Sequence, residues 1–140
     1  MGETAKNLKI DKSYRRVSSI KGLKLKRNTK INRTHIIMDI YKCDDKVLAK
    51  AAILEQRVKR ILEEYKLEPK IQTFYQFQPF GVTAAVFTQG VQFTLHTWPE
   101  HRSAAVDLYC FNGRKRATDI MESLKTVFKS AEYDMRVRKR

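Results

Sequence analysis

The chain has 140 residues, the size of a single domain. Hydrophobic residues make up 42% and charged residues 31%, which excludes a disordered chain, and no apolar run is long enough to span a membrane. The first residues lack the apolar stretch of a secretion signal, so we expect a cytoplasmic protein.

Positive charge is concentrated near the N-terminus. The chain has 29 Lys and Arg against 15 Asp and Glu, a net charge of +14. Residues 1–34 hold 11 basic and 2 acidic side chains, a net +9, and residues 35–140 hold 18 and 13, a net +5. We therefore divide the chain into a basic extension, 1–34, with one short strand at 23–25, and a folded domain, 35–140. Such an arm attracts polyanions or serves solubility.

The apolar pattern predicts strands and helices in the folded domain. A short apolar run indicates a buried strand at 35–41, after which Asp44 or Asp45 can cap a helix. Apolar residues then recur every three or four positions over 47–65, which predicts one amphipathic helix that stops before Pro69. Further strands are predicted at 71–77, 82–88, 91–96, 104–110 and 133–137, with a second helix around 120–128.

The order of these elements is β-α-β-β-β-β-α-β. Strands cluster between two helices that each carry a single apolar stripe. This order favours an α+β fold, a two-layer α/β sandwich in which a mainly antiparallel sheet is covered on one face by two helices.

The densest group of functional side chains follows the strand that ends at His96. Loops at strand ends carry polar side chains into open clefts, so this segment is the natural site. His96 suits acid–base chemistry near neutral pH. Glu100 can accept hydrogen bonds from ligand hydroxyls, and Trp98 and Phe77 can stack on a ring. The ordinary alternative is a structural His96 and a Trp98 that belongs to the core.

The two cysteines predict no special chemistry. Cys43 and Cys110 each end an apolar strand, where a buried cysteine acts as a small hydrophobic residue. No metal-binding spacing such as C-x-x-C is present, so no metal site is expected.

Several blocks of sequence together carry a family signature. They are Phe-Gln-Pro-Phe-Gly-Val-Thr at 77–83, Leu-His-Thr-Trp-Pro-Glu-His at 95–101, Ala-Ala-Val-Asp-Leu-Tyr at 104–109, and the opening strand at 35–44. With these blocks, roughly residues 35–130 resemble the prokaryotic S-adenosylmethionine decarboxylase family. The resemblance implies a two-layer α/β sandwich, an S-adenosylmethionine-type ligand, and sites near subunit contacts, hence a homo-oligomer.

The sequence departs from this family at its central chemistry. Members cleave themselves at a Glu-Ser bond, and the serine becomes a pyruvoyl group that forms a Schiff base with the substrate. Gly90 and Val91 occupy these positions here, followed by Gln92. Valine has no hydroxyl, so we expect no pyruvoyl group and no other cofactor. The family's catalytic cysteine falls on Phe111, one position after Cys110.

The resemblance also assigns roles by position. His96 matches a histidine that assists processing, Phe77 matches an aromatic that stacks near the ligand, and Glu100 matches a carboxylate that holds the ribose hydroxyls. The predicted catalytic residues are Glu100 and His96, and the predicted ligand-binding residues are Phe77, Trp98, Glu100, Val91 and Phe111.

Four functions are compatible with the sequence, and the one we favour least is ordinary decarboxylation by an unusual route. The other three are as follows. In the first, which we favour, the chain binds S-adenosylmethionine or a nucleotide derivative. It then cleaves that ligand as a lyase, because the substrate's own carboxylate can close homoserine lactone and expel methylthioadenosine. In the second, the chain is a catalytically inactive regulatory or binding subunit of an active decarboxylase. In the third, it binds nucleic acid through residues 1–34.

Overall fold

The computed structural model describes residues 32–139. The short strand predicted at 23–25, and the nucleic-acid contacts predicted for residues 1–34, therefore fall almost entirely outside the described residues and stay predictions. The folded domain begins with a strand at Thr34, one residue before the predicted boundary.

Six strands and three helices make up the domain. The strands are β1 (Thr34–Tyr41), β2 (Pro69–Gln76), β3 (Val82–Thr88), β4 (Val91–Trp98), β5 (Ser103–Cys110) and β6 (Glu132–Lys139). The helices are α1 (Asp45–Ala49), α2 (Ala51–Glu64) and α3 (Arg114–Val127), with a short 3-10 turn, η1 (Pro99–His101), after β4. Within the described residues, no helix is both long enough and apolar enough to cross a bilayer.

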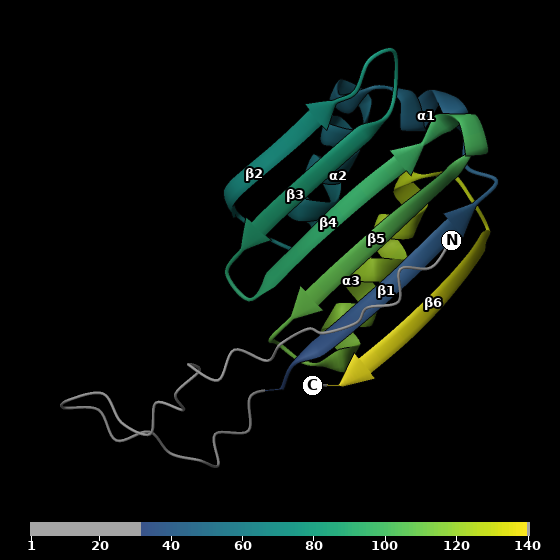
Figure 1. The fold of residues 1–140 in the computed structure, drawn as a ribbon. Coiled ribbons are helices and arrows are strands. Elements are labelled where there is room, and N and C mark those ends of the chain that lie inside the picture. The colour runs from purple at the N-terminus through teal and green to yellow at the C-terminus, as the bar shows by residue number, and fades with distance from the viewer. Residues whose placement is uncertain (1–31, 140) are drawn as a thin grey trace, which may run out of the picture. The chain divides into compact units, whose positions relative to one another are not determined.

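All six strands join in one antiparallel sheet. The strand order is β2-β3-β4-β5-β1-β6, which makes β2 and β6 the edges among the described residues. The helices lie on one face of this sheet, and the other face carries none of them (Figure 1). The predicted α+β sandwich is thus confirmed. We call the uncovered side the open face.

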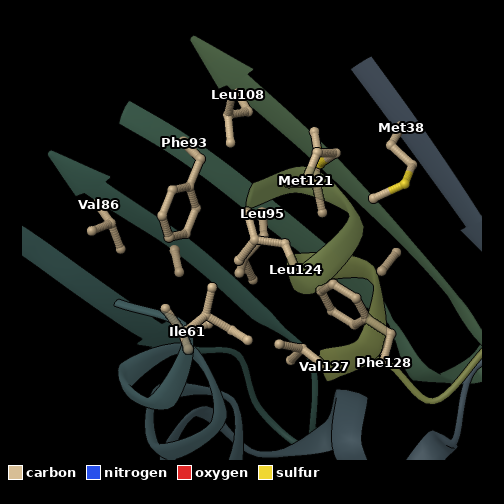
Figure 2. Close-up of a cluster of buried hydrophobic side chains, with 14 of the residues drawn as sticks. Met38, Ile61, Val86, Phe93, Leu95, Leu108, Met121, Leu124, Val127 and Phe128 are labelled. Atoms are coloured by element: carbon tan, nitrogen blue, oxygen red, sulfur yellow. The ribbon is translucent and has the colours of Figure 1, made fainter. Parts of the chain in front are cut away.

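The core fills the space between the sheet and the helices. Alternate residues of each central strand point to the helices and are buried, as the period of two in a strand requires. Figure 2 shows Phe93, Leu95 and Leu108 of the sheet meeting Leu124 and Phe128 from the α3 region. Each of these five side chains is at most 2% exposed. The position of each strand relative to the helices is fixed by this packing.

The predicted helix over 47–65 is in fact two helices, α1 and α2. The backbone is extended at Lys50, with φ −122° and ψ 127°. A side chain from β2 explains the break: Gln76 accepts a hydrogen bond from Ala51 N at 2.7 Å and donates one to Ala49 O at 2.9 Å. The Gln76 amide thus satisfies the backbone groups that a continuous helix would have paired.

Several element boundaries also differ from the prediction, by one or two residues in the strands and by more in α3. Helix α3 begins at Arg114, well before residue 120, because its first turn is basic and buries only Ala117, so the apolar pattern starts late. Strand β4 continues past residue 96 to Trp98. The predicted cap is present, since Asp44 accepts a hydrogen bond from Lys46 N at 3.0 Å.

Candidate ligand-binding site

A hollow of about 340 Å³ lies where β3 begins and β4 ends. Its lining residues are Phe77, Phe80, Gly81, Thr83, His96, Thr97, Trp98 and Glu100. Four of the predicted site residues, namely Phe77, His96, Trp98 and Glu100, therefore lie in one hollow. We call it the pocket.

The loop between β2 and β3 forms one wall of the pocket and is held by Gln76. The Gln76 amide donates to Gly81 O at 3.0 Å and to Phe77 O at 2.9 Å, in addition to its contacts with the α1–α2 junction. Gly81 N donates to Ala49 O at 3.1 Å. Gly81 has a φ of +108°, which side-chain-bearing residues rarely adopt, so glycine suits this position. One glutamine thus fixes the loop that presents Phe77 and Phe80.

The end of β4 is anchored from the helix side by Thr97. This hydroxyl is 7% exposed; it donates to Leu48 O of α1 at 2.8 Å and accepts from Val82 N at 2.9 Å. Because neighbouring residues of a strand point to opposite faces, the buried Thr97 leaves His96 and Trp98 on the open face. The anchor therefore fixes the direction of both pocket side chains.

His96 is placed in the pocket by a cross-strand contact. Its Nδ1 and Thr83 Oγ1 share a hydrogen bond of 3.0 Å, and the two residues are register partners of β4 and β3. The His96 ring lies 6.2 Å from the Trp98 ring, centroid to centroid. Trp98 is 42% exposed, so it is available to a ligand and is not a core residue.

Glu100 projects from η1 and is exposed at the mouth of the pocket. The turn ends at Arg102, whose Nε donates to Cys43 O at 2.9 Å and so ties η1 to the end of β1. Burial raises the pKa of the Cys43 thiol to about 11. This cysteine therefore stays neutral and offers no nucleophile to the site.

The pocket combines flat aromatic faces, one carboxylate and one imidazole. Aromatic faces attract cationic groups as well as stacking on rings. A carboxylate accepts hydrogen bonds from paired hydroxyls. Together these groups suit a nucleoside that carries a positive charge close to its sugar.

The two other predicted ligand-binding residues, Val91 and Phe111, lie at the opposite end of β4. Val91 begins the strand and Trp98 ends it, seven residues or about 23 Å away at a rise of about 3.3 Å per residue. The Val91 side chain is 0% exposed and belongs to the core. Phe111 is 41% exposed and meets the Tyr109 ring of the open face edge-on at 5.0 Å. Within one chain, these two residues do not join the pocket.

A second hollow, of about 290 Å³, lies on the open face and was not predicted. Its wall includes His35, whose Nε2 lies 3.4 Å from Asp107 Oδ1, together with Phe87 and Tyr109. The sequence could have placed His35 and Asp107 on the open face, because both alternate with buried residues along their strands. Gln76 and Thr97, which hold the pocket walls, were also missed, since their hydrogen-bond partners are 25 and 49 residues away.

The structure is a two-layer α/β sandwich with a pocket of aromatic and acidic side chains at one end of its sheet. Known proteins with this combination were sought by sequence and by fold. The family model described as S-adenosylmethionine decarboxylase matches residues 34–140. The S-adenosylmethionine decarboxylase proenzyme of Thermotoga petrophila is 32% identical over 96 residues, covering 69% of this chain and 74% of the relative. That of Sulfurihydrogenibium sp. is 32% identical over 111 residues, covering 76% and 80%. The chain belongs to the S-adenosylmethionine decarboxylase family.

Solved structures agree with this assignment. The crystal structure of the adenosylmethionine decarboxylase from Aquifex aeolicus matches with a TM-score of 0.72 and 28% identity, covering 79% of this chain and 92% of that one. The Trypanosoma brucei AdoMetDC-delta26 monomer shares the fold with a TM-score of 0.56 and 17% identity, and 45% of its length is covered.

These relatives correct one expectation drawn from the sequence. The absence of the pyruvoyl serine led us to expect a protein without any cofactor. The relatives are decarboxylase proenzymes, precursors of enzymes that form a pyruvoyl group by self-cleavage. The prediction of no cofactor is therefore wrong for a member of this family.

The residues at the β3–β4 hairpin do not fit the precursor of that group. Val91 has no hydroxyl, and its side chain is buried in the core. The nearby Thr88 hydroxyl donates to Val91 O at 2.8 Å, and Gly90 O accepts from Phe111 N at 2.9 Å. The first contact closes the hairpin, and the second ties it to the end of β5. The family cofactor and this chain thus disagree at position 91, and no reaction step is assigned to the group here.

Proposed function

We propose that this chain binds S-adenosylmethionine, or a nucleotide derivative of it, in the pocket at the end of β4. The observation that carries the proposal is the convergence of Phe77, Trp98, His96 and Glu100 on one hollow. The family membership supports the same ligand.

In this proposal, each pocket residue contacts a different part of the ligand. Phe77 and Trp98 are 48% and 42% exposed, which leaves their faces free for the adenine ring or the sulfonium. Glu100 accepts hydrogen bonds from the ribose hydroxyls, and its negative charge favours a cationic ligand. His96, held by Thr83, donates or accepts a hydrogen bond at the reacting end.

The reaction proposed for this ligand is an internal displacement. A carboxylate oxygen of the methionine chain attacks the γ-carbon and forms a C–O bond. The C–S bond breaks, and its electron pair stays on sulfur. The products are methylthioadenosine and homoserine lactone, and no proton is transferred. The protein's contribution is to hold the chain bent, since well-oriented internal reactions reach effective molarities of about 10⁵–10⁸ M.

Calorimetric titration of the full chain with S-adenosylmethionine tests binding. The double variant Phe77→Ala/Trp98→Ala should lose binding, whereas Ile71→Ala, an exposed apolar residue elsewhere on β2, should keep it. Equal affinity in all three proteins, or no binding in any, overturns the proposal. Chromatography of the incubated ligand tests cleavage separately: binding without methylthioadenosine formation rejects the lyase reaction alone.

We also propose that the chain forms a homo-oligomer through its open face. Exposed apolar side chains gather there, and such patches mark interaction sites. They include Ile37, Tyr75, Phe77, Phe87, Trp98 and Phe111. The site residues predicted from the sequence lie at both ends of β4, too far apart for one small ligand. Two copies packed face to face with strands reversed place the pocket of one near the Phe111 end of the other.

A charge at the centre of the open face tests this arrangement. Ala105 lies between His96 and Asp39 in the register. Ala105→Arg should halve the mass measured by sedimentation, and Thr126→Arg, on the exposed side of α3, should not change it. An unaltered mass for Ala105→Arg rejects the face-to-face arrangement.

One observation favours a second candidate function, a regulatory subunit of an active decarboxylase. The hydroxyl that family members process is replaced by a valine methyl group in the core. In that role the open face would pair with a processed relative. Co-expression with such a relative should then give a mixed oligomer with an altered decarboxylation rate, and separate elution of the two chains rejects this role.

A further inference from the structure

The edge strand β6 has its charges sorted by sign. On the open face, Glu132 and Asp134 occupy its first half, and Arg136 and Arg138 occupy its second half. All four side chains are exposed. Between them, Tyr133, Met135 and Val137 turn toward the helix side and are half-buried against the core. Met135 is the midpoint of this pattern.

We propose that β6 pairs with β6 of a second copy of this chain, antiparallel and centred on Met135. An edge strand presents unpaired backbone N–H and C=O groups, which a second strand can complete. A two-fold axis through Met135 places Asp134 opposite the second copy's position 136, and Glu132 opposite its position 138. Every charged residue of the open-face row from 132 to 138 then meets the opposite sign.

Only this register matches the charges. Residues that face each other in an antiparallel pair point to the same side of the sheet, so the axis must pass through one residue. An axis at Asp134 sets that carboxylate against its own copy, and an axis at Arg136 does the same with two guanidinium groups. The Met135 register also sets Tyr133 opposite the second copy's position 137 on the helix side, where apolar contacts continue the core.

The neighbouring strand adds negative charge beside the acidic half of β6. Asp134 is the register partner of Asp39 in β1, so two carboxylates lie side by side on the open face. Glu132 already holds Lys42 at 2.8 Å, but its side chain is 54% exposed and has room for a second cation. The arginines supplied by the second copy would neutralise this cluster.

The pairing differs from the face-to-face arrangement in the surface it uses. Face-to-face packing buries the open face, whereas β6 pairing extends the sheet sideways and keeps the open face clear. The two contacts are therefore separable, and neither requires the pocket to bind a ligand.

Two charge reversals and their mixture test the proposal by sedimentation of the full chain. In a pair of Asp134→Arg chains, position 134 of each copy faces position 136 of the other, and both positions are positive. In a pair of Arg136→Asp chains, both of these positions are negative. Each variant should associate about tenfold or more weakly than the unaltered chain. Mixing the two variants should restore association, because each supplies the sign that the other lacks.

Two further measurements keep the test decisive. The double variant D134R/R136D swaps the signs within one chain and should associate as the unaltered chain does, with circular dichroism confirming its fold. Repeating the series in the Ala105→Arg background removes any contribution of the open face. Equal mass for the unaltered chain and both single variants, or a mixture that fails to regain mass, overturns the β6 pairing.

Discussion

The two ends of β4 differ in what holds them. At the Trp98 end, polar contacts from Gln76, Thr97 and Thr83 fix the walls of a hollow whose aromatic rings stay exposed. At the Val91 end, the strand begins in the apolar core, and the hairpin is held by the Thr88 hydroxyl and by the backbone of Phe111. By the family resemblance, the processing chemistry falls at the Val91 end. The groups suited to hold a nucleoside belong to the Trp98 end.

In the proposed function, ligand recognition depends on the Trp98 end of β4, whereas the self-processing of the family would depend on the Val91 end. The two ends lie seven residues apart on one strand, so a change at Val91 should leave the pocket walls in place.

The largest effect is expected from Val91→Ser, which puts a hydroxyl into the core at the Val91 end. Loss of buried methyl groups and burial of a polar atom should lower the free energy of unfolding by about 2–3 kcal/mol. The adjacent Gln92→Ser, on the open face, should change it by less than about 0.5 kcal/mol. Urea unfolding measures both. Equal effects of the two substitutions mean that Val91 is not a core residue.

Gln76→Ala should have the next largest effect, and at the Trp98 end. Three backbone carbonyls and one backbone N–H lose the Gln76 amide. Because Ala49 O and Gly81 O keep backbone donors and water can reach the exposed loop, the expected loss is about 1–2 kcal/mol. Ligand affinity should fall as well, because Phe77 is no longer held. Gln72→Ala on the same strand is the control. Unchanged affinity in Gln76→Ala would show that the loop does not shape the pocket.

Glu100→Gln should weaken S-adenosylmethionine binding by about tenfold, the worth of a hydrogen bond to a charged group. The melting temperature should not change, because Glu100 is exposed. Calorimetry compares it with Glu64→Gln, an exposed carboxylate at the end of α2. An equal loss in both variants would mean that net charge, not the position of Glu100, governs binding.

The smallest effect concerns Cys43, behind the Trp98 end. The pKa of its thiol rises from 9.0 to about 11 on folding, chiefly through burial. The unfolded chain then loses this proton above pH 9 while the folded chain keeps it, so stability is complete below pH 9 and declines between pH 9 and 11. Cys43→Ala should flatten this part of the stability profile. An identical slope in both proteins would rule out Cys43 as its source.

Most of the sheet and four pocket residues could be predicted from the sequence. Strand alternation and helical periodicity are local, and His96, Trp98 and Glu100 lie within five residues of one another. The break at Lys50 could not be predicted, because it depends on Gln76 from a distant strand. The position of Val91 was predictable and missed: Val91, Phe93 and Leu95 alternate on one face, which points Val91 into the core.

The central claim is that a ligand occupies the Trp98 end of β4. Trp98 is the only tryptophan of the chain, so its fluorescence reports on this pocket alone. Titration of the full chain with S-adenosylmethionine should give a saturable change in Trp98 emission, at the concentrations where calorimetry finds binding, and Phe77→Ala should shift or remove it. Calorimetric binding without any change in Trp98 emission would place the ligand elsewhere and contradict the claim.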